Sequence, residues 1–216
     1  MKNLIFILTF SLALAACDSL TTDTKTGDKD ATVDSNNPIT KSLLEMRQKE
    51  QSLQNKIDEA SDQFGDEQAL FELDEQQQKM YVEHFAALEK MIGDEGWISQ
   101  KKYGEEASLQ ALTILKNAPP NQLDKHLSLV LDAAKNGEAN LAEVAFIHDK
   151  VLMHRSEKQL YGTQIAFNEK KGINDVYPIK DPANVDKRRA EVGLEPLAEA
   201  LKKMGIEYWI KVASNE

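Results

Sequence analysis

The chain has a single cysteine among its 216 residues, at position 17. It lies directly after a secretion signal, so the folded part keeps no thiol for a disulfide, for catalysis or for a metal ion. Long apolar runs are equally scarce. The one clear run extends from Leu4 to Ala16, behind the positive charge of Lys2. It is too short to span a bilayer as a stable anchor, and it predicts a signal peptide over residues 1–16.

Several chemical signatures are also missing from the sequence. There is no glycine-rich phosphate loop and no nucleophile elbow. His148 and His154 are six residues apart and therefore point to different faces of one helix, while His84 and His126 lie in other segments. This spacing does not suit a zinc site. We therefore expect no metal and no cofactor, and we assign no residue a catalytic role.

Basic residues are too few to balance the acidic ones. Lysine and arginine number 26 against 36 aspartates and glutamates, which gives a formal net charge of −10. Such a chain is a poor partner for nucleic acid or for anionic lipid headgroups. The acidity would suit a basic partner, but it is also a common means of staying soluble.

What the chain does have is a lipoprotein signal. The residues Leu14-Ala15-Ala16-Cys17 are typical of a bacterial lipobox, in which the cysteine is acylated and the signal is cut before it. At about 0.8 kcal/mol per buried CH₂, more than one acyl chain anchors a protein stably. The sequence thus predicts a lipidated Cys17 and a periplasm-facing place in the cell envelope. Asp18 resembles the inner-membrane retention signal of enterobacterial lipoproteins, which slightly favours that membrane and leaves the outer membrane open.

The next segment, residues 18–38, contains almost no apolar side chains. It cannot bury enough surface to offset the entropy of ordering it. As a flexible chain of about 20 residues it has a reach of ~25 Å. We interpret residues 17–38 as the lipidated cysteine followed by a disordered tether.

The remaining residues, 39–216, are predicted to form a single helical domain. Apolar spacing favours a helix over 39–64, whose stripe is interrupted by Glu50, and then one long helix or two shorter ones over 66–92. Gly93 and Gly96, on either side of Asp94-Glu95, are expected to end that helix. Trp97 would be either a plug over the core or one wall of a pocket. Further helices, joined by short turns that make them antiparallel neighbours, are expected over residues 104–117, 122–136 and 139–155.

Alternating residues over 160–167 predict a strand, with a partner over 176–179. A lone hairpin is marginal in water, so it should pack on the helices. Asp181 and Pro182 suggest a helix start, with the aspartate as cap and a stop at Gly193. Pro196 would open one more helix. The predicted fold is therefore mainly α, an antiparallel helical bundle with one small β-hairpin at about 160–179.

The segment 97–197 resembles a bacterial domain family of unknown function, found in soluble proteins and in lipoproteins. The resemblance implies a mostly helical domain and no established activity. A histidine commonly stands in that family at the position of Asn117 and an arginine at that of Lys150, so this chain departs from the pattern at both. The matching elements are Gly137-Glu138, Phe146-Ile147-His148-Asp149-Lys150-Val151, Gln159 with Tyr161-Gly162-Thr163-Gln164, Pro178-Ile179 with Asp181, Val185-Asp186 with Arg188-Arg189, and Val192-Gly193-Leu194 with Pro196-Leu197.

His148 lies inside an apolar stripe beside Asp149, and it is either a hydrogen-bonded core residue or part of a pocket wall. The residues left without a role in starting or ending a helix surround it in the sequence. We take the following as candidates for binding a ligand or partner: His148, Asp149, Gln159, Tyr161, Thr163, Gln164, Arg188 and Arg189.

Two functional hypotheses follow. The preferred one is an envelope lipoprotein whose helical domain binds a partner protein or a small polar ligand. An immunity-like protein against an envelope-targeted toxin would be one such binder. The alternative is a hydrolase or transferase that uses His148 and Asp149 as acid and base, with Tyr161 and Arg189. That alternative requires His148 to line an open cleft within hydrogen-bond reach of Tyr161 or Arg189.

Overall fold

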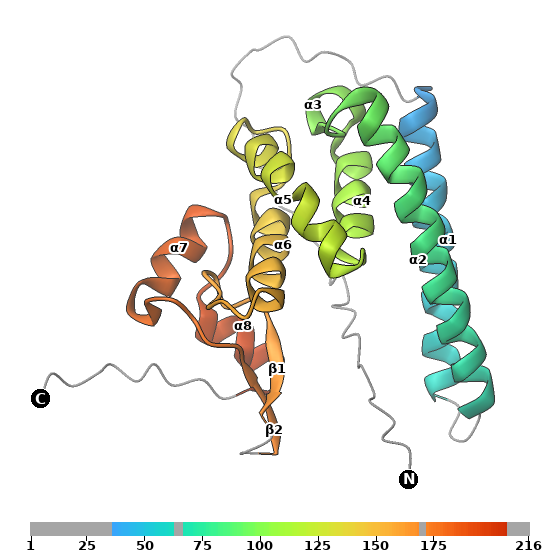
Figure 1. Ribbon diagram of the computed structural model, residues 1–216. Coiled ribbons are helices and arrows are strands. Elements are labelled where there is room, and N and C mark those ends of the chain that lie inside the picture. Colours follow the sequence, from blue (N-terminus) through green and yellow to red (C-terminus); the bar gives the residue numbers. More distant parts are fainter. Residues whose placement is uncertain (1–35, 63–66, 169–171, 207–216) are drawn as a thin grey trace, which may run out of the picture. The chain divides into compact units, whose positions relative to one another are not determined.

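The computed structural model describes residues 36–62, 67–168 and 172–206 (Figure 1). All of them belong to one compact unit, which spans residues 31–216. The predicted signal peptide and lipobox, and nearly all of the predicted tether, lie outside the described residues. Within the described part, no helix is long and apolar enough to cross a membrane.

The described chain forms eight α-helices, one short 3-10 helix and a two-stranded antiparallel sheet, which confirms the mainly helical fold with a small hairpin. The elements are α1 (Pro38–Asp62), α2 (Glu67–Glu95), α3 (Gln100–Tyr103), α4 (Glu105–Lys116), α5 (Pro120–Lys135), α6 (Leu141–His154), β1 (Ile165–Asn168), β2 (Ile173–Val176), η1 (Pro182–Asn184), α7 (Val185–Glu191) and α8 (Leu197–Lys203).

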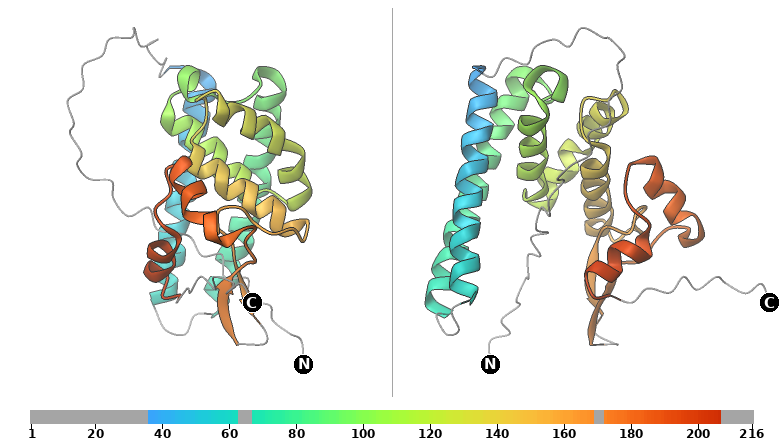
Figure 2. Two further views of the ribbon diagram at one scale, coloured as in Figure 1. Left: turned by 90° about the vertical axis from the view of Figure 1, so that its left-hand side faces the viewer. Right: turned by 180° about the vertical axis from the view of Figure 1, so that it is seen from behind.

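Helix α4 is the centre of the larger core. It contacts α1, α2 and α6, and most of its circumference is buried, as its apolar residues on several faces predict. Leu112 and Leu115 are fully buried, and each contributes about 1.5–3 kcal/mol through removal from water. Helices α1 and α2 lie side by side and form an outer pair beside α4 (Figures 1 and 2).

The second helix is a single long helix. It continues through Gly93 to Glu95, and of the two glycines expected to end it, Gly96 is where the chain turns, with a φ of +79°. A single glycine inside a helix costs only about 1 kcal/mol relative to alanine, so Gly93 does not break it. Trp97 follows with 7% of its surface exposed, inside the large core. It is therefore the plug over the core and not a pocket wall.

A second, smaller core lies in the C-terminal part of the chain. It consists of Ile179, Val185, Leu197 and Leu201. Ile165 of β1 and Val176 of β2, which are paired in the sheet, pack against it. The hairpin is therefore supported by α7 and α8, as its marginal stability alone requires.

Three local predictions in this part are wrong. The second strand is Ile173–Val176 and not residues 176–179. The first strand begins at Ile165 and not at residue 160, because residues 160–164 form a loop in which Gly162 has a φ of +72°. Asp181 does not cap a helix. Its own φ is +46°, and its carboxylate accepts a hydrogen bond from the Asn184 side chain at 2.8 Å. The predicted helix is split into η1 and α7.

Gly162 allows a close approach that a larger residue would block. A Cβ built there would lie 2.8 Å from Leu197 Cδ1 and 3.0 Å from Ile179 Cδ1. Both methyl groups belong to buried side chains of the small core. Gly193, with a φ of +77°, has nothing within 4 Å of such a Cβ.

These two glycines give a matched pair of variants. Gly162→Ala and Gly193→Ala should both lose about 1 kcal/mol, because alanine is strained at positive φ. Gly162→Ala should lose a further 1–2 kcal/mol or so, because it overpacks the small core. Urea unfolding followed by circular dichroism measures the difference. Equal losses would show that the contact with Leu197 does not constrain the loop.

Candidate functional site

Asp149 on α6 is fully buried, and backbone groups surround its carboxylate. Oδ1 accepts hydrogen bonds from the Leu160 N–H at 2.7 Å and the Tyr161 N–H at 3.2 Å. Oδ2 accepts from the Tyr161 N–H at 3.1 Å and from both the N–H and the hydroxyl of Thr163 at 3.0 Å. The loop after α6 is therefore folded around one carboxylate.

Gln159 has a similar role on the other side of the loop. Its side chain is fully buried, donates to the carbonyls of Gln164 at 3.0 Å and Tyr177 at 2.6 Å, and accepts from the Gln164 N–H at 2.9 Å. Its backbone bonds to Pro178 and Lys180, which forms an isolated parallel bridge with Ile179, beyond the end of β2. All of its hydrogen-bonding groups are thus used to join two stretches of backbone.

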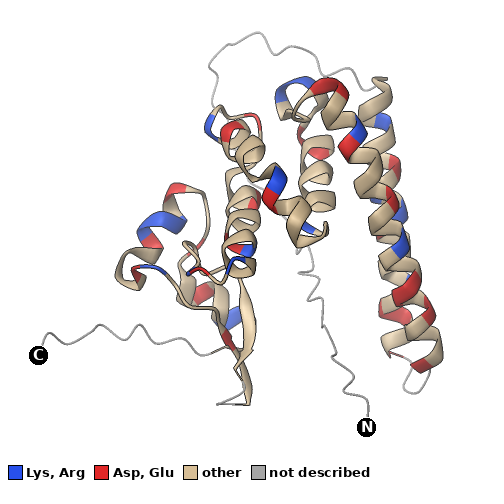
Figure 3. Ribbon diagram, viewed as in Figure 1, with Lys and Arg blue, Asp and Glu red and all other residues tan. Residues whose placement is uncertain are grey.

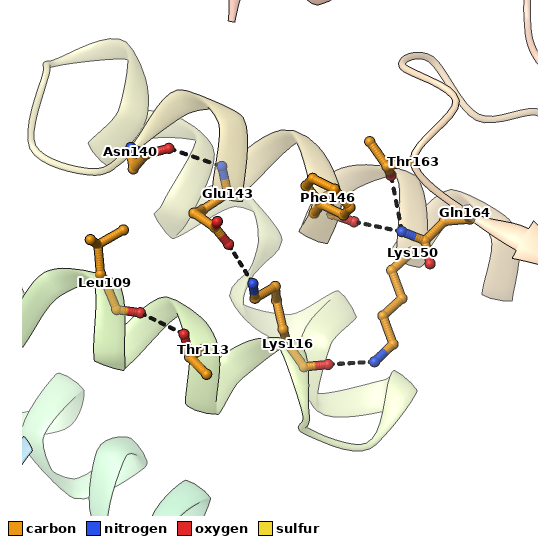
Figure 4. Close-up of polar contacts among 9 residues, drawn as sticks. All are labelled: Leu109, Thr113, Lys116, Asn140, Glu143, Phe146, Lys150, Thr163 and Gln164. Atoms are coloured by element: carbon orange, nitrogen blue, oxygen red, sulfur yellow. Dashed lines mark hydrogen bonds and ion pairs between the residues drawn. The ribbon is translucent and has the colours of Figure 1, made fainter. Parts of the chain in front are cut away.

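Gln164 connects this loop back to α6. Its side-chain amide donates to the Phe146 carbonyl at 3.3 Å and to the Thr163 hydroxyl at 3.0 Å (Figure 4). Thr163 in turn donates to Asp149. These polar side chains bond to one another and to the backbone in one continuous set.

Arg188 on α7 also binds backbone carbonyls. Its Nε donates to the Leu160 carbonyl at 2.8 Å, and Nη2 donates to the carbonyls of Lys180 at 2.6 Å and Asp181 at 3.0 Å. Its second terminal nitrogen lies 3.8 Å from the Asp181 carboxylate. This one side chain therefore joins α7 to two loops, which are about 20 residues apart in the sequence.

Arg189 is the inward arginine that the adjacent pair predicts, with 4% of its surface exposed. Nε donates to the Glu195 carbonyl at 2.6 Å, and Nη1 donates to the Tyr161 carbonyl at 2.7 Å. Burial lowers the pKa of Arg189, while the nearby Asp186, Glu195 and Asp149 charges oppose this effect. Arginine remains charged in proteins, so the guanidinium keeps its donors directed at these carbonyls.

We call Asp149, Gln159, Gln164, Arg188 and Arg189 the loop-binding network. The sequence placed all eight candidate residues in one neighbourhood, and the structure brings them together there. The five network residues direct their side chains mainly at backbone groups, and Thr163 joins them through its hydroxyl. Their polar atoms hold the loop in place, so they are poor choices for direct contact with a ligand.

His148 and Tyr161 are the two candidates whose rings are not used in this way. Both are half-buried, and their ring centroids lie 6.4 Å apart with planes inclined by 58°. Within the described residues, neither the Tyr161 hydroxyl nor the His148 ring has a hydrogen-bond partner. Burial lowers the pKa of His148 and raises the pKa of Tyr161, so both rings are neutral at pH 7.

A second polar cluster, which the sequence analysis missed, lies between α1, α2 and α4. Glu50 Oε1 is 2.7 Å from His84 Nδ1, and Glu50 Oε2 accepts a hydrogen bond from Gln110 Nε2 at 2.9 Å. His84 and Gln110 are buried. The sequence did contain an indication of this cluster, because Glu50 interrupts the apolar stripe of the first helix. Its partners are 34 and 60 residues away, beyond what spacing can indicate.

Tyr81 lies near this cluster and lines an open pocket of about 260 Å³. Burial raises the pKa of Tyr81 to about 12, and the negative charge of Glu50 adds to the rise. The rest of the lining comes from α2 and from the link between α4 and α5, namely Gln78, Val82, Asn117, Ala118, Pro119 and Pro120. His84 is not part of this lining, so the buried pair does not open into the pocket.

Charges of both signs are interspersed along α1 and α2 (Figure 3).

Within the described ranges, no group of three or more histidine, cysteine, aspartate or glutamate side chains could hold a metal ion. Trp97 Nε1 and Ser108 Oγ are buried and lack a hydrogen-bond partner in the described part of the chain. Trp97 belongs to the large core, and Ser108 is a buried residue of α4.

Residues 37–213 match the Family of unknown function (DUF6624), which is well over half of the chain. The chain belongs to this family. No curated protein and no solved structure matches it. The DUF6624 match extends beyond the segment 97–197 on both sides, and it therefore includes the Glu50–His84 pair as well as the loop-binding network.

Replacing Asp149 tests whether its carboxylate holds the loop of residues 160–164 in place. In Asp149→Asn, an NH₂ group would replace one oxygen and face backbone N–H donors, leaving at least one buried donor unsatisfied. We expect a loss of about 2–4 kcal/mol in the free energy of unfolding. The control is Asp94→Asn at an exposed site on α2, where we expect a change within about 0.5 kcal/mol. Similar losses in the two variants would contradict the structural role of Asp149.

Proposed function

We propose that the chain is a lipid-anchored envelope protein whose DUF6624 domain binds a partner protein through a patch centred on His148 and Tyr161. The observation that carries this proposal is a difference in how the candidate residues use their side chains. The loop-binding network uses its polar atoms internally, whereas the His148 and Tyr161 rings are left half-exposed and side by side. Two adjacent, rigidly supported rings are a common centre of a protein interface.

The surroundings of the two rings support a protein partner. The charges of Arg155 and Glu157 act on His148, and those of Arg188 and Glu191 act on Tyr161. A neutral aromatic centre with a rim of both charge signs resembles the composition of binding hot spots. Such a rim favours a partner with complementary charges of both signs over a nucleic acid or a metal ion.

The rigidity of the patch also favours binding. The Tyr161 backbone is held on both sides, since its N–H donates to Asp149 and its carbonyl accepts from Arg189. The ring is therefore positioned before any partner arrives, which reduces the entropy lost on binding.

The hydrolase or transferase hypothesis is the second candidate, and the geometry supports it less. It requires Asp149 to exchange a proton with His148 or with a substrate. Both oxygens of Asp149 instead accept hydrogen bonds from the loop, and its side chain is fully buried. His148 contacts Tyr161 through a tilted ring contact, without a hydrogen bond. An immunity-like protein remains one form of the proposed binder.

The envelope location rests on the sequence. The lipobox Leu14-Ala15-Ala16-Cys17 would place acyl chains on Cys17, and the polar residues after it would hold the domain clear of the headgroups. Asp18 slightly favours the inner membrane. A binder held in this way meets its partners at a membrane surface, where the effective concentration of other anchored proteins is high.

The anchor is tested by Cys17→Ser. We expect the variant to incorporate no labelled palmitate and to leave the membrane pellet, because serine cannot form the thioether that carries the diacylglyceryl group. Asp18→Ser keeps the cysteine and should remain labelled and membrane-bound. Palmitate labelling of Cys17→Ser at the wild-type level would disprove the lipidation site.

The binding patch is tested by photo-crosslinking in cells. A photoreactive phenylalanine analogue at position 161 should give one crosslinked product of discrete mass, and His148→Ala in the same chain should reduce its yield at least about fivefold, in the range of a hot-spot loss of 1 kcal/mol or more. The matched control carries the analogue at Tyr177, a half-buried tyrosine of the same segment. Equal products from the two positions, or none from position 161, would contradict the proposal.

A further inference from the structure

Lys150 on α6 is half-buried, and its ammonium group bonds to a neutral carbonyl oxygen and not to a carboxylate. Its side chain runs to α4, where Nζ donates a hydrogen bond to the carbonyl of Lys116, the last residue of that helix (Figure 4). Burial lowers the pKa of Lys150, and the charge of Lys116 adds to the effect. A helix-end carbonyl carries only part of a negative charge, so it satisfies one donor without neutralising the ammonium group.

The neighbouring lysine already has its counter-charge. Lys116 Nζ pairs with the Glu143 carboxylate and lies 5.9 Å from the centroid of the Phe146 ring. No carboxylate of the described residues forms an ion pair with Lys150. The two lysines and Glu143 therefore sum to one positive charge, in a chain whose net charge is −10.

His154 adds a third nitrogen-bearing side chain to this region. It follows Lys150 by four residues and therefore lies on the same side of α6. It is exposed, and burial together with the charge of Lys150 lowers its pKa, so the ring is neutral at pH 7 and can still donate one N–H. The junction of α4 and α6 thus offers an uncompensated ammonium beside a neutral imidazole.

We infer that the α4–α6 junction, formed by Lys116, Lys150 and His154, binds the carboxylate group of a small organic acid. The carboxylate would supply the counter-charge that Lys150 lacks. A singly charged anion matches the local sum of one positive charge, whereas a phosphate monoester at about −1.5 to −2 would leave an excess of negative charge. Lysine acts here as a compact point charge, which one carboxylate oxygen can satisfy.

This site is separate from the proposed partner patch. His148 and Lys150 are two residues apart on one helix, which turns their side chains by about 200° relative to each other. The inference therefore goes beyond the proposed function, and it can fail or hold without affecting the His148–Tyr161 patch.

The test follows the lysine side-chain ε-CH₂ signals by NMR in the full-length chain, with acetate as the probe and chloride at equal ionic strength as the reference. Lys150→Gln assigns the signal, and circular dichroism checks that the variant is folded. We expect a saturable acetate-dependent shift of the Lys150 signal that chloride does not produce. A response that follows ionic strength alone would overturn the inference.

Glu143→Gln makes the test sharper because it keeps Lys150 in place. It removes the local negative charge, so the affinity for acetate should rise by about fivefold or more, the order expected for one unit charge at about 4 Å that is screened by water. Phosphate should then compete with acetate. The matched control is Glu95→Gln, which removes the carboxylate partner of Lys102 on α3 and should leave the Lys150 response unchanged. Equal effects of the two variants, or tighter binding of phosphate than of acetate by the wild type, would contradict the charge argument.

Discussion

The buried carboxylate of Asp149 is the constraint on which the C-terminal part of this protein depends. A buried charge costs several kcal/mol unless enough donors surround it, and here Leu160, Tyr161 and Thr163 supply them from one short loop. Once the loop is folded in this way, its outward carbonyls become acceptors for Arg188 and Arg189. A charge on α6 thus positions α7 without an extensive apolar contact between the two helices.

The same arrangement explains why these residues suggested a binding or catalytic site in the sequence. Aspartate, glutamine and arginine residues outside helix ends suggest binding or catalysis, since such groups seldom lie in a core without a partner. In this fold their partner is the backbone. Sequence reasoning placed these residues near one another, but it could not tell whether their hydrogen bonds end on a ligand or on backbone groups of the same chain.

Much of the helical framework could be predicted, because apolar periodicity reports which face of a helix is buried. The bounds of α4, α5 and α6 lie within a few residues of expectation. The errors fall where a long-range contact overrides local preference. Residues 160–164 form a loop and not a strand, because Asp149 binds the amides on either side of Gly162. The Asp181 carboxylate bonds to Asn184 and lies near Arg188 instead of capping a helix. Glu50 was visible as an interruption, but its partner His84 lies on another helix.

The central claim is that a rigid, internally bonded loop holds the Tyr161 ring beside His148 of α6, and that the loop is held by Asp149. Amide hydrogen exchange of the full-length chain tests this most directly, residue by residue. The account predicts that the amides of Leu160, Tyr161 and Thr163 exchange nearly as slowly as those of α4 in the large core, such as Leu112. Exchange of these three amides as fast as that of the exposed Lys158 would contradict it.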